Sequence, residues 1–162
     1  MEYEVSTTIL EFSEYKNIDF NKLSIELEKW VQKYFHFNGL KFDYNLFSAY
    51  DFTENIIYIS QVNKPETNKK FRQFLYEYGA PAAATDFIDD SLIFLHELSH
   101  CLTNSLYDDF EMTIYEFQKE NVDSFTYWEV RDEFEANMVV VDFINSNPEA
   151  IYELDKIFWE WW

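Results

Sequence analysis

The sequence predicts an α+β fold in which a small early sheet is followed by helices that carry the functional site. Two observations predict the class. Alternating apolar residues lie mainly in the first 62 positions, whereas the three-and-four spacing of amphipathic helices prevails after residue 65. The chain has only 2 Gly and 3 Pro, which argues against a β-sandwich with many loops. Its 162 residues suit one hydrophobic core, so we expect residues 1–162 to form a single domain.

The first part of the chain is expected to supply the sheet and one helix. Asp19 can cap a helix over residues 20–35, because apolar side chains recur there every three or four positions. The Asn38-Gly39 pair is expected to end this helix, since glycine tolerates a left-handed turn. β-Branched and aromatic residues predict strands, which cover residues 3–12, 40–47 and 55–62.

The second part is predicted to be helical. Pro65 and Pro148 suit the first turns of helices, and either Thr85 or Asp89 can cap the helix between them. The stretch 104–125 is polar, acidic and irregular, and it is expected either to border a substrate cleft or to be a plain surface connection. The predicted helices cover residues 65–78, 92–103, 127–145 and the segment from 148 onward.

The composition is strongly acidic. Asp and Glu number 31 against 12 Lys and Arg, which gives a formal net charge of −19. Such a surface repels nucleic-acid phosphates and anionic lipid headgroups, so we expect no direct nucleic-acid binding and no membrane binding. A basic protein or peptide partner is favoured in encounter rate, although acidity also keeps an aromatic-rich protein in solution.

The expected compartment is the cytoplasm. Cys101 is the single cysteine, so no disulfide can form within the chain, which fits a reducing compartment. The first residues lack the basic region and apolar run of a secretory signal. The apolar stretches are much shorter than the roughly 20 residues needed to span a bilayer.

Residues 96–100, His-Glu-Leu-Ser-His, carry the strongest chemical signal. On a helix, His96 and His100 lie one turn apart on one face and can direct two imidazole nitrogens at one Zn²⁺ ion. Glu97 lies about 100° round the helix, where it can reach a water without binding the metal. Zinc lowers the pKa of a bound water to about 7, and Glu97 is expected to accept its proton and to pass it to the departing amine.

A zinc ion of this kind needs a third protein ligand. The best donor is Glu133 on the later helix, and Asn137 lies one turn further on the same face. The small Ala136 between them allows two helices to approach closely, and Asn137 is then placed to hydrogen-bond a ligand histidine. Glu135 is the alternative ligand, although it points nearly opposite to Glu133. In so acidic a chain, Glu133 could also be an ordinary surface carboxylate.

These two motifs together resemble the gluzincin metallopeptidases. The helix with His-Glu-x-x-His and the later Glu-Phe-x-Ala-Asn are most similar to the ImmA/IrrE family, and the strand at 55–62 before the zinc helix suits that plan. The resemblance implies a single zincin-like domain that holds zinc at His96, His100 and Glu133, with Glu97 as general base. It also implies a narrow-specificity regulatory protease. The chain departs from the family pattern at Ser99, where a glycine is usual.

Other features remain open at the level of sequence. A peptidase also needs a group that stabilises the tetrahedral oxyanion, and the candidates are Tyr107, Tyr115, Tyr127 and Arg131. Any exposed part of Trp159, Trp161 and Trp162 is expected to form a partner or self-association surface. The alternatives to a peptidase are an acidic inhibitor that mimics DNA and an inactive metallopeptidase scaffold that binds protein.

Overall fold

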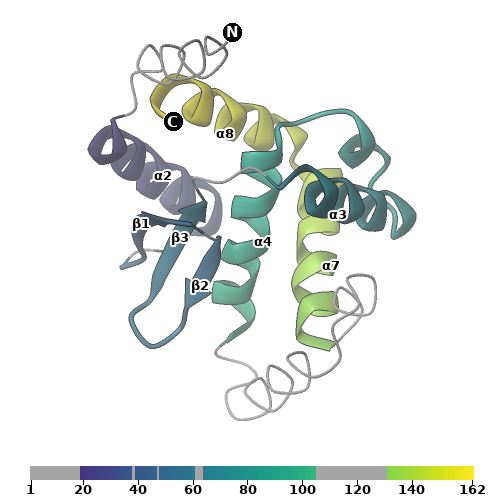
Figure 1. The fold of residues 1–162 in the computed structure, drawn as a ribbon, viewed down its shortest axis with the longest axis horizontal. Helices are drawn as coiled ribbons and strands as arrows, with labels where there is room; N and C mark the ends of the chain where they lie inside the picture. The colour runs from purple at the N-terminus through teal and green to yellow at the C-terminus, as the bar shows by residue number, and fades with distance from the viewer. Residues whose placement is uncertain (1–18, 38, 47, 61–63, 105–130) are drawn as a thin grey trace, which may run out of the picture.

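The computed structural model describes residues 19–37, 39–46, 48–60, 64–104 and 131–162 (Figure 1). These residues form a three-stranded mixed sheet and five α-helices, so the predicted α+β class is confirmed. The elements are α2 (Phe20–Phe35), β1 (Lys41–Asn45), β2 (Ala49–Asp51), β3 (Ile56–Ser60), α3 (Pro65–Glu77), the short 3-10 helix η1 (Pro81–Ala84), α4 (Asp89–Asn104), α7 (Arg131–Ser146) and α8 (Pro148–Trp161).

Helix α2 has the predicted bounds. The Asp19 side chain accepts a hydrogen bond from the backbone N–H of Lys22 at 3.1 Å, as an N-cap does. At the other end His36, with a φ of 53°, already takes the left-handed conformation that was expected at the Asn38-Gly39 pair. Gly39 is itself left-handed, with a φ of 87°, and leads the chain into β1.

The sheet has the strand order β1-β3-β2. β3 pairs in parallel with β1 and antiparallel with β2, so β2 is an edge strand. In the central strand Ile57 and Ile59 are buried, whereas their neighbours on the opposite face are half-buried, as alternation requires. The predicted strands at 40–47 and 55–62 are confirmed with shorter bounds. β2 was not predicted, and the strand expected at 3–12 lies outside the described residues.

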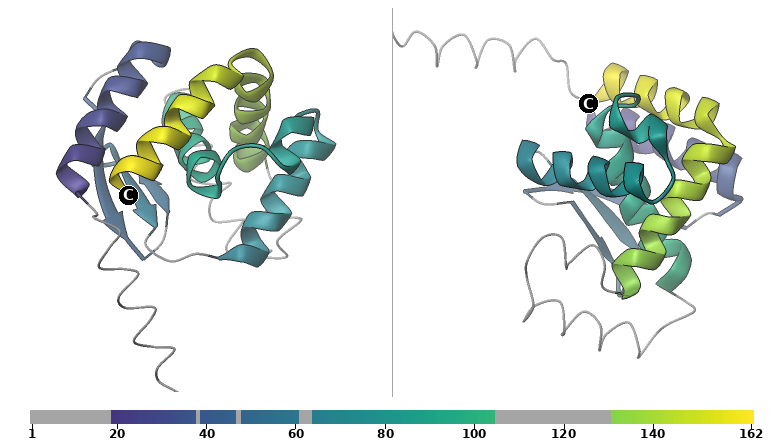
Figure 2. Two further views of the ribbon diagram at one scale, coloured as in Figure 1. Left: turned by 90° about the horizontal axis from the view of Figure 1, so that it is seen from above. Right: turned by 90° about the vertical axis from the view of Figure 1, so that its right-hand side faces the viewer.

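Helix α4 is central to the arrangement. It lies between the sheet on one side and α7 on the other, and α8 crosses above it (Figure 1). Helices α2 and α8 lie side by side (Figure 2). The indole N–H of Trp30 on α2 donates to the carbonyl of Ala150 on α8 at 2.8 Å. Buried side chains of α2, β3, α3, α4, α7 and α8 form a continuous hydrophobic core.

Contacts from other elements fix the N-terminal end of α4. The Arg72 guanidinium on α3 pairs with Asp89 at 2.7 Å and donates to the carbonyls of Ala83 and Asp86. The backbone N–H of Ile88, just before the helix, donates to the carboxylate of Asp155 on α8. The N-terminal turn is therefore capped from α8, and neither Thr85 nor Asp89 acts as the expected side-chain cap.

The remaining helices agree with the sequence, apart from their exact bounds. Pro65 and Pro148 occupy the first positions of α3 and α8, as proline does in a first helical turn. α7 spans Arg131–Ser146, and residues 127–130 of the helix predicted at 127–145 lie outside the described residues. The predicted irregular stretch 104–125 also lies outside them, apart from residue 104, which ends α4. None of the described helices is both long and apolar enough to cross a bilayer.

Candidate metal centre

His96 and His100 lie on one face of α4, as their spacing predicts. His96 is buried and His100 is half-buried. The other faces of the helix hold it in the core through the buried Leu92, Leu95 and Leu98. Ser99, which stands where glycine was expected, donates its hydroxyl hydrogen to the carbonyl of Leu95 at 2.7 Å and so satisfies a buried polar group within its own helix.

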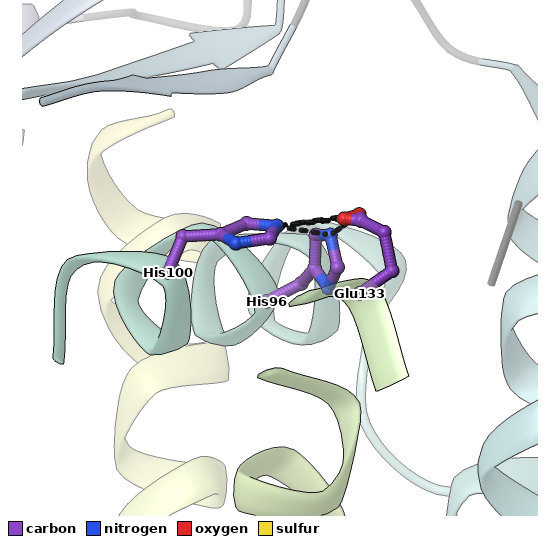
Figure 3. Close-up of side chains that lie close together, drawn as sticks. All are labelled: His96, His100 and Glu133. Carbon is purple, nitrogen blue, oxygen red and sulfur yellow. Dashed lines mark hydrogen bonds and ion pairs between the residues drawn. The ribbon is translucent and has the colours of Figure 1, made fainter. Parts of the chain in front are cut away.

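Glu133 reaches this face from α7. Its carboxylate lies 3.1 Å from Nε2 of His96 and 2.8 Å from Nε2 of His100, and the two Nε2 atoms are 3.2 Å apart (Figure 3). All three side chains point to the same spot between the helices (Figure 3). The structure thus brings together the three residues that the sequence nominated as ligands.

The spacing of these atoms suits a metal ion. Four ligands at the zinc bond length of about 2.0–2.1 Å, placed at the corners of a tetrahedron, lie about 3.3–3.4 Å from one another. The observed separations of 2.8, 3.1 and 3.2 Å are slightly smaller, so a small widening of the triangle would admit an ion. The three side chains therefore form a group that can hold a metal ion.

The electrostatics of the group also favour a cation. Burial opposes the charged form of Glu133, but His100 and His96 outweigh it and lower the pKa of this carboxyl. Burial likewise opposes the charged form of His96, but Glu133 outweighs it and raises the pKa of the imidazole. A carboxylate that stays ionised while fully buried needs a positive partner, which is either a protonated histidine or a metal ion.

Two further side chains hold His96 in place. Oδ1 of Asn137 lies 2.8 Å from Nδ1 of His96, in the position that the sequence predicted for this residue. Because an amide oxygen only accepts hydrogen bonds, Nδ1 carries a proton, and Nε2 is the nitrogen that faces Glu133, where it can hold either a metal ion or a second proton. The ring of Phe71 on α3 meets the imidazole edge to face, with centroids 5.4 Å apart. No sequence motif pointed to Phe71 as a residue that touches the site.

Glu97 lies next to His96 on α4 and is half-buried. It is not among the three converging ligand residues. Burial raises the pKa of its carboxyl, which His96 and His100 only partly offset. A carboxyl of this kind, beside a metal-binding group but outside it, is suited to accept and release a proton.

The other sequence candidates are placed as follows. Glu135, the alternative ligand, is half-buried on α7 and is not part of the converging group. Arg131 begins α7, and Tyr107, Tyr115 and Tyr127 lie outside the described residues, so the predicted oxyanion stabiliser remains unassigned.

At the C-terminus Trp159 is 73% exposed, whereas Trp162 is buried. The tyrosine at position 50 contacts Glu97 through its backbone, and no sequence pattern pointed to it.

Comparisons of the chain with known protein families, with curated proteins and with solved structures found no match.

Proposed function

We propose that this protein is a zinc-dependent peptidase. The observation that supports it is the convergence of two imidazole nitrogens and a buried carboxylate on one point, with a second carboxyl beside them that is not a ligand. Within the part of the chain that the structure describes, three side chains converge, which is the number of protein ligands in a catalytic zinc site that keeps its fourth position for water or substrate. A structural zinc site would instead be closed by four protein ligands.

Zinc is the metal that we propose because of the donors. Imidazole suits zinc, copper, iron and nickel, and two histidines with one carboxylate are the ligands of several zinc peptidases. When bound, zinc would lower the pKa of a water to about 7 and polarise the scissile carbonyl. Asn137 would keep His96 in the tautomer that binds the ion, and Glu133 would neutralise part of its charge.

Glu97 is proposed as the general base and acid. Its carboxylate would accept a proton from the attacking water, and the resulting carboxylic acid would protonate the amine as the peptide bond breaks. The raised pKa of this carboxyl suits both steps, because a proton carrier works best when its pKa is near the working pH.

The proposed substrate is a protein or peptide that carries basic residues. The net charge of −19 raises the local concentration of cationic partners and speeds their encounter. The resemblance of the two motifs to a family of regulatory proteases favours narrow specificity. We also propose that the exposed indole of Trp159 belongs to a partner surface at the C-terminal end of α8.

Peptide profiling with two matched variants tests this proposal. The zinc-loaded wild type is incubated with a peptide library or a cell extract, and new termini are identified by mass spectrometry. Glu97→Gln should abolish every cleavage while keeping the zinc, because the amide cannot accept the proton. Glu135→Gln, a carboxyl on α7 outside the converging group, should keep both zinc and cleavage.

The alternative readings predict different results. If Glu97→Gln keeps the full biological effect of the wild type, the fold serves as a binding scaffold. The net charge also favours a second candidate, an inhibitor that mimics nucleic acid. That candidate predicts competition with a basic DNA-binding protein that weakens steeply with salt, and no zinc-dependent cleavage.

A further inference from the structure

The edge strand β2 faces the part of α4 that carries Glu97. Among the described strands β2 pairs only with β3, and its other side lies beside α4 (Figure 1). The backbone N–H of Tyr50, the middle residue of β2, donates a hydrogen bond to the carboxylate of Glu97. In an antiparallel ladder an N–H that points away from the partner strand belongs to a non-hydrogen-bonded pair. Tyr50 and Ile57 form that pair here.

The side chain of Tyr50 fixes this donor. Its hydroxyl donates to Oδ1 of Asn55 at 2.8 Å, and the amide of Asn55 donates to the carbonyl of Gly39 at 3.1 Å. The thiol of Cys101 donates to the same oxygen, Oδ1 of Asn55, at 3.7 Å, and it interacts with the Tyr50 side chain. The strand is thereby tied both to the start of β1 and to α4.

Glu97 and Cys101 are four residues apart, so they lie one above the other on the same face of α4. Tyr50 contacts both, with its backbone at Glu97 and its side chain at Cys101. The adjacent face of the helix carries His96 and His100. Tyr50 therefore links β2 directly to the turns of α4 that carry the converging histidines.

We propose that Tyr50 is a positioning residue for Glu97, whose carboxylate its backbone N–H holds beside the metal-binding group. This inference rests on the proposed peptidase function. A glutamate on a helix has three rotatable side-chain bonds, and a general base must be held close to its proton donor to be effective. The carboxylate can accept about four hydrogen bonds, so one bond from Tyr50 leaves acceptor sites for water.

The Tyr50→Pro and Tyr50→Ala variants separate this role from a structural one. Proline lacks the N–H and is tolerated on an edge strand where that group points away from the ladder. Alanine keeps the N–H but removes the bonds to Asn55 and Cys101. Both variants should bind about one zinc per chain, as measured by mass spectrometry of the metal. A merely structural residue would lower thermal stability without lowering kcat in the folded, zinc-loaded protein.

The proposal predicts that kcat is highest for the wild type, lower for Tyr50→Ala and lowest for Tyr50→Pro. The kcat of Tyr50→Ala should exceed that of Tyr50→Pro by about ten- to a hundredfold, because the two variants differ by one hydrogen bond to a charged group. KM should change by only about twofold, because the bond assists the chemical step and does not hold the substrate. Equal kcat values for the alanine and proline variants, with zinc retained, would overturn the proposal.

A second measurement does not depend on cleavage. In zinc-loaded protein labelled with 15N-tyrosine, the Tyr50 amide is identified as the signal that is missing from Tyr50→Phe. Glu97→Ala should move this signal upfield by more than the amides of Tyr44 in β1 and Tyr58 in β3. An unmoved Tyr50 amide would overturn the proposal even if Tyr50→Pro failed to fold. If the amide moves but the wild type cleaves nothing, the contact stands and the peptidase function is what fails.

Discussion

Nδ1 of His96 and Oδ1 of Asn137 lie 2.8 Å apart across the packed helices α4 and α7. Both side chains are buried, and Nδ2 of Asn137 has no hydrogen-bond partner among the described residues. A buried amide nitrogen without a hydrogen-bond partner lowers the stability of the fold. Asn137 offsets this cost by orienting the His96 ring toward the carboxylate of Glu133.

Replacement of Asn137 by alanine should weaken zinc binding. The substitution leaves Nδ1 of His96 without its acceptor, and loss of such a partner lowers metal affinity by about 10- to 100-fold. Competition with a zinc-sensitive dye measures the affinity. Asn145→Ala is the control, because Asn145 lies on the same helix but donates to the carbonyl of Gly79. Equal affinities for the two variants would show that Asn137 does not support the ligand.

The metal-free protein should have a characteristic pH dependence of stability. The pKa of Glu133 is lowered in the folded state, so its stabilising effect is present above its ordinary pKa of 4.5 and is lost as the pH falls further. The pKa of His96 is raised, so its effect is full below its ordinary pKa of 6.5 and is lost as the pH rises through the folded value. Together these two groups stabilise the fold most between pH 4.5 and 6.5.

Thermal unfolding in the presence of a chelator measures this effect. The difference in Tm between the wild type and Glu133→Gln should be largest in that window and should shrink as the pH rises through the raised pKa of His96 and the imidazole loses its proton. A difference that grows steadily with pH would contradict the pairing of these two groups in the absence of metal.

Arg72 should matter for stability although it lies outside the site. Its guanidinium is 19% exposed and joins α3 to Asp89 and to the backbone carbonyls before α4. Arg72→Lys keeps the positive charge, but a single ammonium group cannot make all the hydrogen bonds of the planar guanidinium. We therefore expect the free energy of unfolding to fall by about 2–3 kcal/mol. Urea denaturation measures it. Lys69→Ala, an exposed position on the same helix, should stay within about 0.5 kcal/mol of the wild type.

Local sequence signals were sufficient for the helices and for the ligand group. The cap at Asp19 and the prolines at 65 and 148 gave the starts of three helices, because each acts within one turn of its own chain. The choice of Glu133 over Glu135 followed from helical geometry, since the two side chains point to different sides of α7. The contact between His96 and Asn137 likewise follows from two short motifs.

Features set by tertiary contact were not predictable. β2 has three residues, which are too few to show an alternating pattern in the sequence. It forms a strand because its backbone pairs with that of β3. The N-terminal turn of α4 is capped by Asp155, which lies 67 residues away from Ile88 in the chain. The contact of Tyr50 with Glu97 depends on how the sheet sits against α4, which no local pattern encodes.

The most direct test of the central claim is the zinc content of purified wild-type protein beside that of the His100→Ala and Glu133→Ala variants, with anomalous diffraction at the zinc edge to locate the ion. We expect about one zinc per chain in the wild type, bonded to Nε2 of His96, Nε2 of His100 and the carboxylate of Glu133, and a large loss of affinity in both variants. A wild type that takes up no zinc, or a Glu133→Ala protein that binds it as tightly as the wild type, would contradict the account.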